Sequence, residues 1–432
     1  MEKNKNGFIS MTLVYTFLIV FLFLMLAILT AYIQKDKFME TIDSKISEDI
    51  GYDKQTKTTV LNTIISDNTP VSIDNEKNNI YLFDIANADF GNGNGLYYTT
   101  KVEISDENND GVSSRMYFFR GTVENNHLIF AKKCWRIVRT NENGSIRLRY
   151  NGEPIYLNNT PNCPTVDMLK DYAAGPNYKQ SDVSNASSET DKDKGVAVFT
   201  NGGLQDKAYH YASIGKAKFN ENSSSNLGLK YVNDSNTFSP TKAILDTWFV
   251  NNLKNYMDYI SPSSFCNDYE KQNSKSIVPV ATPGSSKNKY KKSDWTNTVS
   301  LKCSNNENYT TTLDITGNKQ LYYPIGLLSA QEIALAGGYL TNGTDQYKGG
   351  VYGIDNKNFY LYTGTSFWTM SPYESNETGA KVIYFDKDGY MQGDKSAALV
   401  SNSYDVIPVI SINGNSVISS GKGTSNNPYI VR

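Results

Sequence analysis

The fold of this chain is decided by residues 115 to 150, which read RMYFFRGTVENNHLIFAKKCWRIVRTNENGSIRLRY. Short runs of β-branched and aromatic residues follow one another here, separated by turns rich in Asn and Gly, which is the pattern of an antiparallel sheet. Strands are predicted at residues 115–120, 128–131, 134–140 and 145–150. In the last run Ile146, Leu148 and Tyr150 alternate with Arg147 and Arg149. This alternation predicts a sheet with one buried face and one solvated face.

Two helices are predicted further along the chain. Ser239 precedes Pro240 as a cap before a first-turn proline, and an apolar stripe at helical spacing continues to Ile260. Residues 329–332 (Ser-Ala-Gln-Glu) form a capping box, and this helix is expected to stop at Gly337. More short strands are predicted at residues 59–65, 80–85, 364–371, 381–385, 406–412, 417–418 and 428–431. The predicted class is α+β, a loop-rich antiparallel sheet domain with a few helices.

The amino-terminal stretch from Phe8 to Ile33 has no charged side chain and is bounded by Lys5 and Lys35. As a helix it would be about 39 Å long, more than the roughly 30 Å of a bilayer's hydrocarbon core. A transmembrane helix is therefore predicted, with a buried core helix and a secretory signal as the alternatives. The lysine flanks favour a cytoplasmic amino terminus. The expected location is the cell membrane, single-pass, with the carboxy-terminal domain extracellular.

Four segments are expected along the chain. Residues 1–33 form a cytoplasmic leader and the transmembrane helix, and residues 34–66 form a helical stalk with apolar residues at steps of four. Residues 67–114 form a small strand-rich linker region, and residues 115–432 form the extracellular α+β domain.

Charge and cysteine content limit the classes of partner and the cellular compartment that are expected. The chain has 42 basic and 44 acidic side chains, a net charge of -2, so no nucleic-acid partner is expected. Its 4 cysteines, Cys134, Cys163, Cys266 and Cys303, all lie in the part predicted to be exported, which suits an oxidising compartment. Neighbours in sequence close the shortest loops. Of the three possible pairings, we therefore predict Cys134 with Cys163 and Cys266 with Cys303.

One segment matches the opening of a calcium loop. Asp106, Asn108 and Asp110 alternate before Gly111, as oxygen ligands do before the sharp turn of such a loop. Tyr117 stands at the twelfth position, where a closing glutamate is usual. A solvated polar turn is the alternative, and no cofactor other than calcium is expected.

Other polar groups are interpreted as structural. Asp386 and Asp388 before Gly389 predict a hairpin turn, with a catalytic carboxylate pair as the alternative. His127 and His210 have no partner at a recognised spacing, which makes each a structural or an exposed histidine. A lysine cluster at residues 287–292 is interpreted as a solvated loop, with contact to phosphate or an acidic wall polymer as the alternative.

The amino terminus resembles the prepilin-type segment of type IV pilins and pseudopilins. A short basic leader ends at Gly7, and Phe8 opens the apolar run. The resemblance implies cleavage after Gly7 by a membrane peptidase and methylation of Phe8, followed by packing with pilin-like subunits. Thr12 stands where that family usually has a glutamate, which argues against filament assembly more than against processing.

A second resemblance covers roughly residues 115 to 432. Four stretches look like an uncharacterised bacterial exported domain that is similar to the formylglycine-generating and C-type-lectin-like folds: residues 134–139, 245–248, 367–372 and 407–410. The resemblance implies a C-type-lectin-like fold. The sugar-reading motifs of calcium-dependent lectins do not occur in the sequence, and the reactive cysteine pair of formylglycine-generating enzymes is matched only by Cys266 and Cys303. These two are expected in a disulfide, so the resemblance implies a fold and not an activity.

The predicted function is a membrane-anchored bacterial cell-surface protein that displays a non-catalytic domain for adhesion or recognition. Its long loops are rich in Tyr and Asn, residues that suit contact with an extracellular glycan or protein ligand; AT-rich codon usage is the alternative cause of that composition. No nucleophile elbow or phosphate-binding glycine pattern occurs, so no enzymatic activity is expected. The alternatives are a minor pilin or pseudopilin subunit and an exported carboxylate-dependent enzyme.

Overall fold

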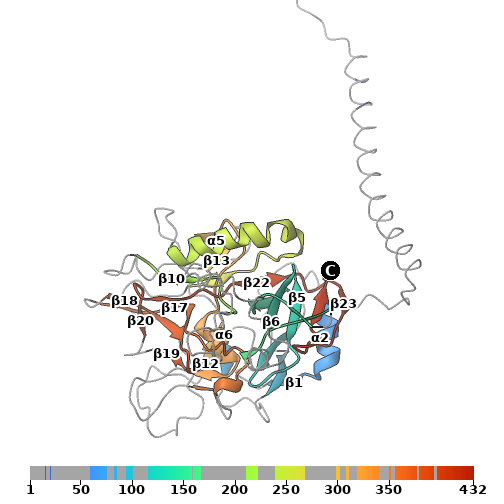
Figure 1. The fold of residues 1–432 in the computed structure, drawn as a ribbon, viewed down its shortest axis with the longest axis horizontal. Coiled ribbons are helices and arrows are strands. Elements are labelled where there is room, and N and C mark those ends of the chain that lie inside the picture. The colour runs from blue at the N-terminus through green and yellow to red at the C-terminus, as the bar shows by residue number, and fades with distance from the viewer. Residues whose placement is uncertain are drawn as a thin grey trace, which may run out of the picture. The chain divides into compact units, whose positions relative to one another are not determined.

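The computed structural model of the chain describes Tyr15, Val20 and residues 59–74, 82–84, 94–100, 115–141, 143–157, 159–166, 211–221, 239–267, 298–301, 308–310, 319–339, 350–351, 356–376, 379–393 and 397–432. By its internal contacts the chain divides into Met1–Thr58 and a compact unit, Thr59–Arg432. Figure 1 shows this unit, in which strands dominate and helices are few.

The largest sheet has nine strands, with the order β1-β3-β4-β6-β5-β24-β23, and β7 joins β6 to β22. Its strands are β1 (Val71–Ser72), β3 (Gly95–Thr99), β4 (Met116–Arg120), β5 (His127–Phe130), β6 (Lys133–Thr140), β7 (Ile146–Tyr150), β22 (Val409–Ile412), β23 (Ile418–Ser420) and β24 (Tyr429–Val431). The pairs β1 with β3 and β24 with β5 are parallel, and the other pairs are antiparallel. The strands predicted within residues 115 to 150 are confirmed as β4 to β7. Strands β1 and β3 belong to this sheet, so strands from residues 67–114 and from residues 115–432 form one sheet.

A second sheet has six strands, with the order β10-β21-β17-β18-β19 and with β20 beside β18. Its strands are β10 (Lys216–Lys218), β17 (Phe367–Asn376), β18 (Gly379–Phe385), β19 (Met391–Gln392), β20 (Ala398–Leu399) and β21 (Ser403–Asp405). The smaller pairings involve β2 (Leu82–Asp84) with β12 (Thr298–Ser300), β8 (Ile155–Leu157) with β9 (Thr160–Asn162), β15 (Gly338–Tyr339) with β16 (Gly350–Val351), and β11 (Phe265–Cys266), β13 (Asn308–Thr310) and β14 (Lys319–Gln320).

The predicted helices form where their caps stand. Helix α5 (Pro240–Asn252) begins after Ser239, whose side chain accepts a hydrogen bond from the Lys242 backbone, and a 3-10 helix, η4 (Lys254–Tyr259), follows it. Helix α6 (Ala330–Leu335) begins with the complete capping box of Ser329 and Glu332. A further 3-10 helix is η5 (Asn356–Asn358).

One strand prediction is wrong. Residues 59–65, predicted as a strand, are helical in α2 (Val60–Asn68). The Thr59 side chain accepts a hydrogen bond from the Asn62 backbone at 3.2 Å. This bond caps the helix. Val60 and Ile64 are buried one turn apart. The β-branched side chains suggested a strand, but the cap and the spacing of four residues favour a helix.

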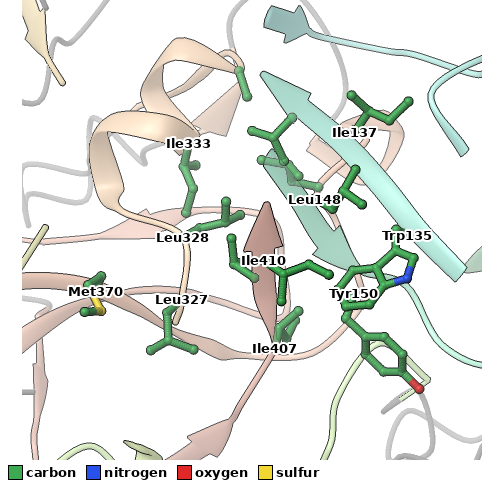
Figure 2. Close-up of a cluster of buried hydrophobic side chains, with 14 of the residues drawn as sticks. Trp135, Ile137, Leu148, Tyr150, Leu327, Leu328, Ile333, Met370, Ile407 and Ile410 are labelled. Atoms are coloured by element: carbon green, nitrogen blue, oxygen red, sulfur yellow. The ribbon is translucent and has the colours of Figure 1, made fainter. Parts of the chain in front are cut away.

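The core lies where the two larger sheets and the helices meet. Figure 2 shows Leu148 and Ile410, cross-strand partners in β7 and β22, close to Leu328 from the segment before α6. Trp135 of β6 makes an edge contact with Trp248 of α5, with ring centroids 6.2 Å apart. Edge contacts of this kind are a favoured geometry for aromatic pairs, and this one holds α5 against the large sheet.

The prediction of a solvated sheet face is wrong. Arg147 and Arg149 on β7 are 3% and 0% exposed, and every residue of that strand is buried. Both faces of β7 are covered. On the arginine face, Arg147 donates a hydrogen bond to Glu332 of α6 and Arg149 donates one to the Tyr360 carbonyl.

The α+β class is confirmed for the described part of the chain. Among the described residues, no helix is both long and apolar enough to cross a membrane. The predicted transmembrane helix, Phe8 to Ile33, lies outside them except for Tyr15 and Val20, and most of the predicted stalk lies outside them as well.

Candidate functional site

A buried ion-pair network centres on Glu332. Its Oε1 atom accepts hydrogen bonds from the Nε atoms of Arg139 and Arg147, each at 3.0 Å. Its Oε2 atom accepts from the Ser329 backbone at 3.0 Å and so completes the capping box of α6. Arg147 also lies over the Phe265 ring, 4.4 Å from its centroid. One carboxylate therefore both starts a helix and connects it to β6 and β7.

The environment keeps Glu332 ionised. Burial by itself would raise the pKa of its carboxyl group, but the charges of Arg147 and Arg139 and the hydrogen bonds to Ser329 and Arg139 outweigh burial. The net pKa of Glu332 is therefore lowered. A group that is fully paired and negatively charged near neutral pH cannot serve as a general acid.

A row of basic side chains crosses the neighbouring strands. His127, Arg136 and Arg149 are direct cross-strand partners in β5, β6 and β7. Arg136 Nη1 contacts His127 Nε2, and Arg136 Nη2 donates to the Val123 carbonyl at 2.6 Å. Tyr360 touches both arginines, because its ring centroid is 5.5 Å from Arg136 Cζ and its carbonyl is 3.5 Å from Arg149 Nη2. We call His127, Arg136 and Arg149 the basic row.

Burial shifts the pKa values of the basic row. The pKa of His127 is well below its usual value, first because of burial and second because Arg136 and Arg149 repel a further positive charge. Burial also lowers the pKa of Arg136, to about 9, so this side chain stays charged at neutral pH. His127 is therefore a neutral, structural histidine, which was one of its two predicted alternatives.

A disulfide-anchored hairpin lies at the end of the large sheet. Cys134 and Cys163 are bonded, as predicted, and β9 ends at Asn162, the residue before Cys163. The hairpin of β8 and β9 presents Tyr156, 67% exposed, and Leu157, 38% exposed. A buried disulfide at its base makes this a firmly anchored hairpin with exposed apolar side chains near its tip.

A second exposed apolar group comes from η4. Met257 and Tyr259 are 42% and 43% exposed. The Tyr259 ring packs edge-on against Phe130, with centroids 6.3 Å apart. Phe130 ends β5 and pairs with Lys133 at the start of β6, next to Cys134. Neighbouring residues of a strand face opposite sides of a sheet, so Phe130 with Tyr259 lies on the face opposite the Cys134–Cys163 disulfide, which packs with Ile129. The two exposed groups are therefore separate, and we call Tyr156 and Leu157 of the hairpin the aromatic surface.

The polar groups beside the hairpin support its base. The Lys133 ammonium group lies 2.7 Å from Glu153 Oε1. The Tyr150 hydroxyl donates to the same carboxylate at 3.1 Å. This surface can offer aromatic stacking, van der Waals area and hydrogen bonds to a ligand, which are the means by which tyrosine-rich surfaces recognise glycans and proteins.

The Asp386 turn is confirmed as a hairpin turn. Asp386 Oδ1 accepts hydrogen bonds from the backbones of Asp388 and Tyr390, at 3.0 and 2.8 Å, and Gly389 adopts a positive φ of 86°. Burial is the largest influence on the Asp386 carboxyl group and raises its pKa. Its oxygens are engaged in closing the turn between β18 and β19, which explains the sequence pattern without a catalytic role.

The structure describes only some of the other predicted site residues. Cys266 is in a disulfide, whereas Cys303 lies outside the described residues, so the pairing of these two stays a prediction. The predicted processing site and calcium loop also lie outside the described residues: Gly7, Phe8, Asp106, Asn108 and Asp110. Within the described ranges, no group of three or more His, Cys, Asp or Glu side chains is arranged to hold a metal ion.

Sequence reasoning missed both central features. Glu332 was recognised only as a capping residue, and nothing local indicated its arginine partners, since Arg139 lies 193 residues and Arg147 lies 185 residues away along the chain. The β8–β9 hairpin had a signal in Asn158-Asn159-Thr160, a turn sequence between apolar residues and Cys163.

Comparisons of the chain with protein-family models, with curated proteins and with solved structures found no match.

Proposed function

We propose that this chain is a membrane-anchored bacterial cell-surface protein whose exported domain binds an extracellular glycan or protein without converting it. The observation that carries the proposal is the aromatic surface, where Tyr156 and Leu157 are displayed on a hairpin anchored by the Cys134–Cys163 disulfide. Large apolar side chains that are exposed on a rigidly anchored hairpin are typical of contact surfaces.

Two further observations support export. The disulfide is of a kind that persists in oxidising compartments outside the cytosol. The uncharged stretch from Phe8 to Ile33 supplies the proposed membrane anchor, so the membrane is one proposed partner. We include a C-type-lectin-like arrangement in the proposal, supported by the sequence resemblance over residues 115 to 432.

Binding without chemical conversion of the ligand is supported by the ionisable groups with shifted pKa values, because these groups are engaged in contacts within the fold. The charge of Glu332 is paired with Arg139 and Arg147, and the turn backbone engages Asp386. His127 is buried and neutral. For each of these groups, burial and contacts within the fold account for its shifted pKa.

The proposal is tested by binding measurements on the full chain in detergent micelles, with a panel of glycans, peptidoglycan fragments and peptides. We expect saturable binding of at least one ligand, recovered unchanged. Replacement of Tyr156→Ser should weaken that binding about tenfold or more, since an exposed aromatic anchor typically contributes about 1 to 3 kcal/mol to a contact.

Tyr322→Ser is the matched control, because Tyr322 is similarly exposed, at 64%, and is not part of the aromatic surface. Equal effects of the two substitutions would contradict the assignment of binding to the hairpin. Conversion of a ligand, abolished by a single Asp or Glu substitution, would favour the enzyme alternative. An amino terminus at Phe8 and co-purification with filaments would favour the pilin alternative.

A further inference from the structure

The basic row has more hydrogen-bond donors than the described residues have acceptors for them. Arg149 is 0% exposed, and its Nη2 atom has the Asn151 side chain as an acceptor at 3.1 Å. Its Nε and Nη1 atoms have no hydrogen-bond partner among the residues that the structure describes, and the same holds for Arg136 Nε. Both side chains carry their charge in a buried environment.

His127, the third member of the basic row, adds another buried hydrogen-bond donor. A guanidinium group has only donors, so His127 Nε2 must accept the hydrogen bond from Arg136 Nη1. A neutral imidazole that accepts at Nε2 carries its proton at Nδ1. Nδ1 is buried and has no acceptor within the described part of the chain. Adjacent positions on β5, β6 and β7 therefore each present at least one buried N–H group that lacks an acceptor.

The charge of the row is not neutralised either. Glu332 is paired with Arg139 and Arg147, and no carboxylate in the described ranges forms an ion pair with Arg136 or Arg149. Like charges placed directly opposite each other in a sheet are destabilising, and buried charge without a partner is more so. Tyr360 contributes a ring face and a carbonyl oxygen, both uncharged.

We propose that the basic row binds one small inorganic anion of the chloride class, held by N–H groups of Arg149 and Arg136 beside Tyr360. An anion accepts several charge-assisted hydrogen bonds at once and cancels one positive charge. A buried water molecule accepts fewer bonds, must find acceptors for its own protons and leaves the charge unchanged. The near-complete burial of both arginines favours a bare, compact ion over phosphate or an organic acid.

The test measures unfolding of the full chain, with its disulfides oxidised, in sodium chloride and in sodium gluconate at equal ionic strength. A ligand that binds only the folded state raises the folding equilibrium constant in proportion to its concentration above Kd. We expect a tenfold increase in that constant for each tenfold increase in chloride, and no such increase in gluconate. Equal stability in the two salts, or an increase with sulfate and not with chloride, would overturn the proposal.

Arg149→Met should abolish the chloride dependence, and Lys218→Met should retain it. Lys218 is the matched control, because its positive charge lies on the surface, in an ion pair with Glu221 at 2.8 Å. Chloride dependence that persists in Arg149→Met would overturn the assignment to this row. If Arg149→Met does not fold, bromide-soaked crystals of the unchanged protein decide: an anomalous peak beside Arg149 and Arg136 supports the proposal, and a map without one overturns it.

Discussion

Glu332→Gln should destabilise the fold by about 3 kcal/mol, because removal of one partner from a buried ion pair typically costs about 3 to 5 kcal/mol. We expect a loss at the lower end of this range, because both arginines retain another hydrogen bond. Arg147 still donates to the Ser264 carbonyl at 2.6 Å, and Arg139 still donates to the Thr140 carbonyl at 3.1 Å. Glutamine also supports a capping box, so the substitution removes the charge and spares the helix start.

The assay is urea unfolding of the oxidised full chain in detergent, followed by the fluorescence of the buried Trp135 and Trp368. The urea midpoint should fall with an unchanged m value. Ser329→Ala is the control, because it removes the cap but keeps the charge of Glu332, and it should cost about 1 kcal/mol. A Glu332→Gln protein within about 0.5 kcal/mol of the unchanged protein would refute the central role of this carboxylate.

Two further predictions concern pH and the disulfide. The pKa of His127 in the folded state lies well below the 6.5 of an unfolded histidine. Below pH 6.5 the unfolded state therefore binds a proton that the folded state does not bind. Stability should therefore fall there by up to about 1.4 kcal/mol per pH unit. Unfolding curves between pH 5 and 8 check this, and His127→Gln should flatten the dependence in that range. The lowered pKa of Glu332 adds a separate loss of stability as the pH falls below its unfolded value of 4.5 and on through its folded value. The cysteines of the Cys134–Cys163 disulfide are 29 residues apart in sequence. Replacing both by Ala should cost about 3 to 4 kcal/mol, as measured by urea unfolding without reductant; a loss below about 1 kcal/mol would contradict an anchoring role.

The sequence predicted the local elements of this fold well, since their signals are local. Strands β4 to β7 follow the alternation and turns of residues 115 to 150. Ser239 and Ser329 mark the starts of α5 and α6, because a capping side chain needs only the first turn of its own helix. The Cys134–Cys163 bond follows from the short loop that it closes.

One error comes from contacts between distant parts of the chain. The alternation of Arg147 and Arg149 with apolar residues looked like a solvated face, since an arginine is rarely buried without a partner. Burial of Arg147 depends on Glu332, which the fold brings to it from 185 residues away. The error at α2 has a different origin, because its cap at Thr59 and the spacing of Val60 and Ile64 are local signals that outweigh the strand preference of its β-branched residues.

The central claim is that this chain displays a binding domain outside the cell, and protease treatment of intact cells tests it most directly. Antibodies against the carboxy-terminal part should detect the loss of residues 59–432 from intact cells, while a cytoplasmic marker protein stays whole. Full protection in intact cells, together with digestion after lysis, would contradict the claim.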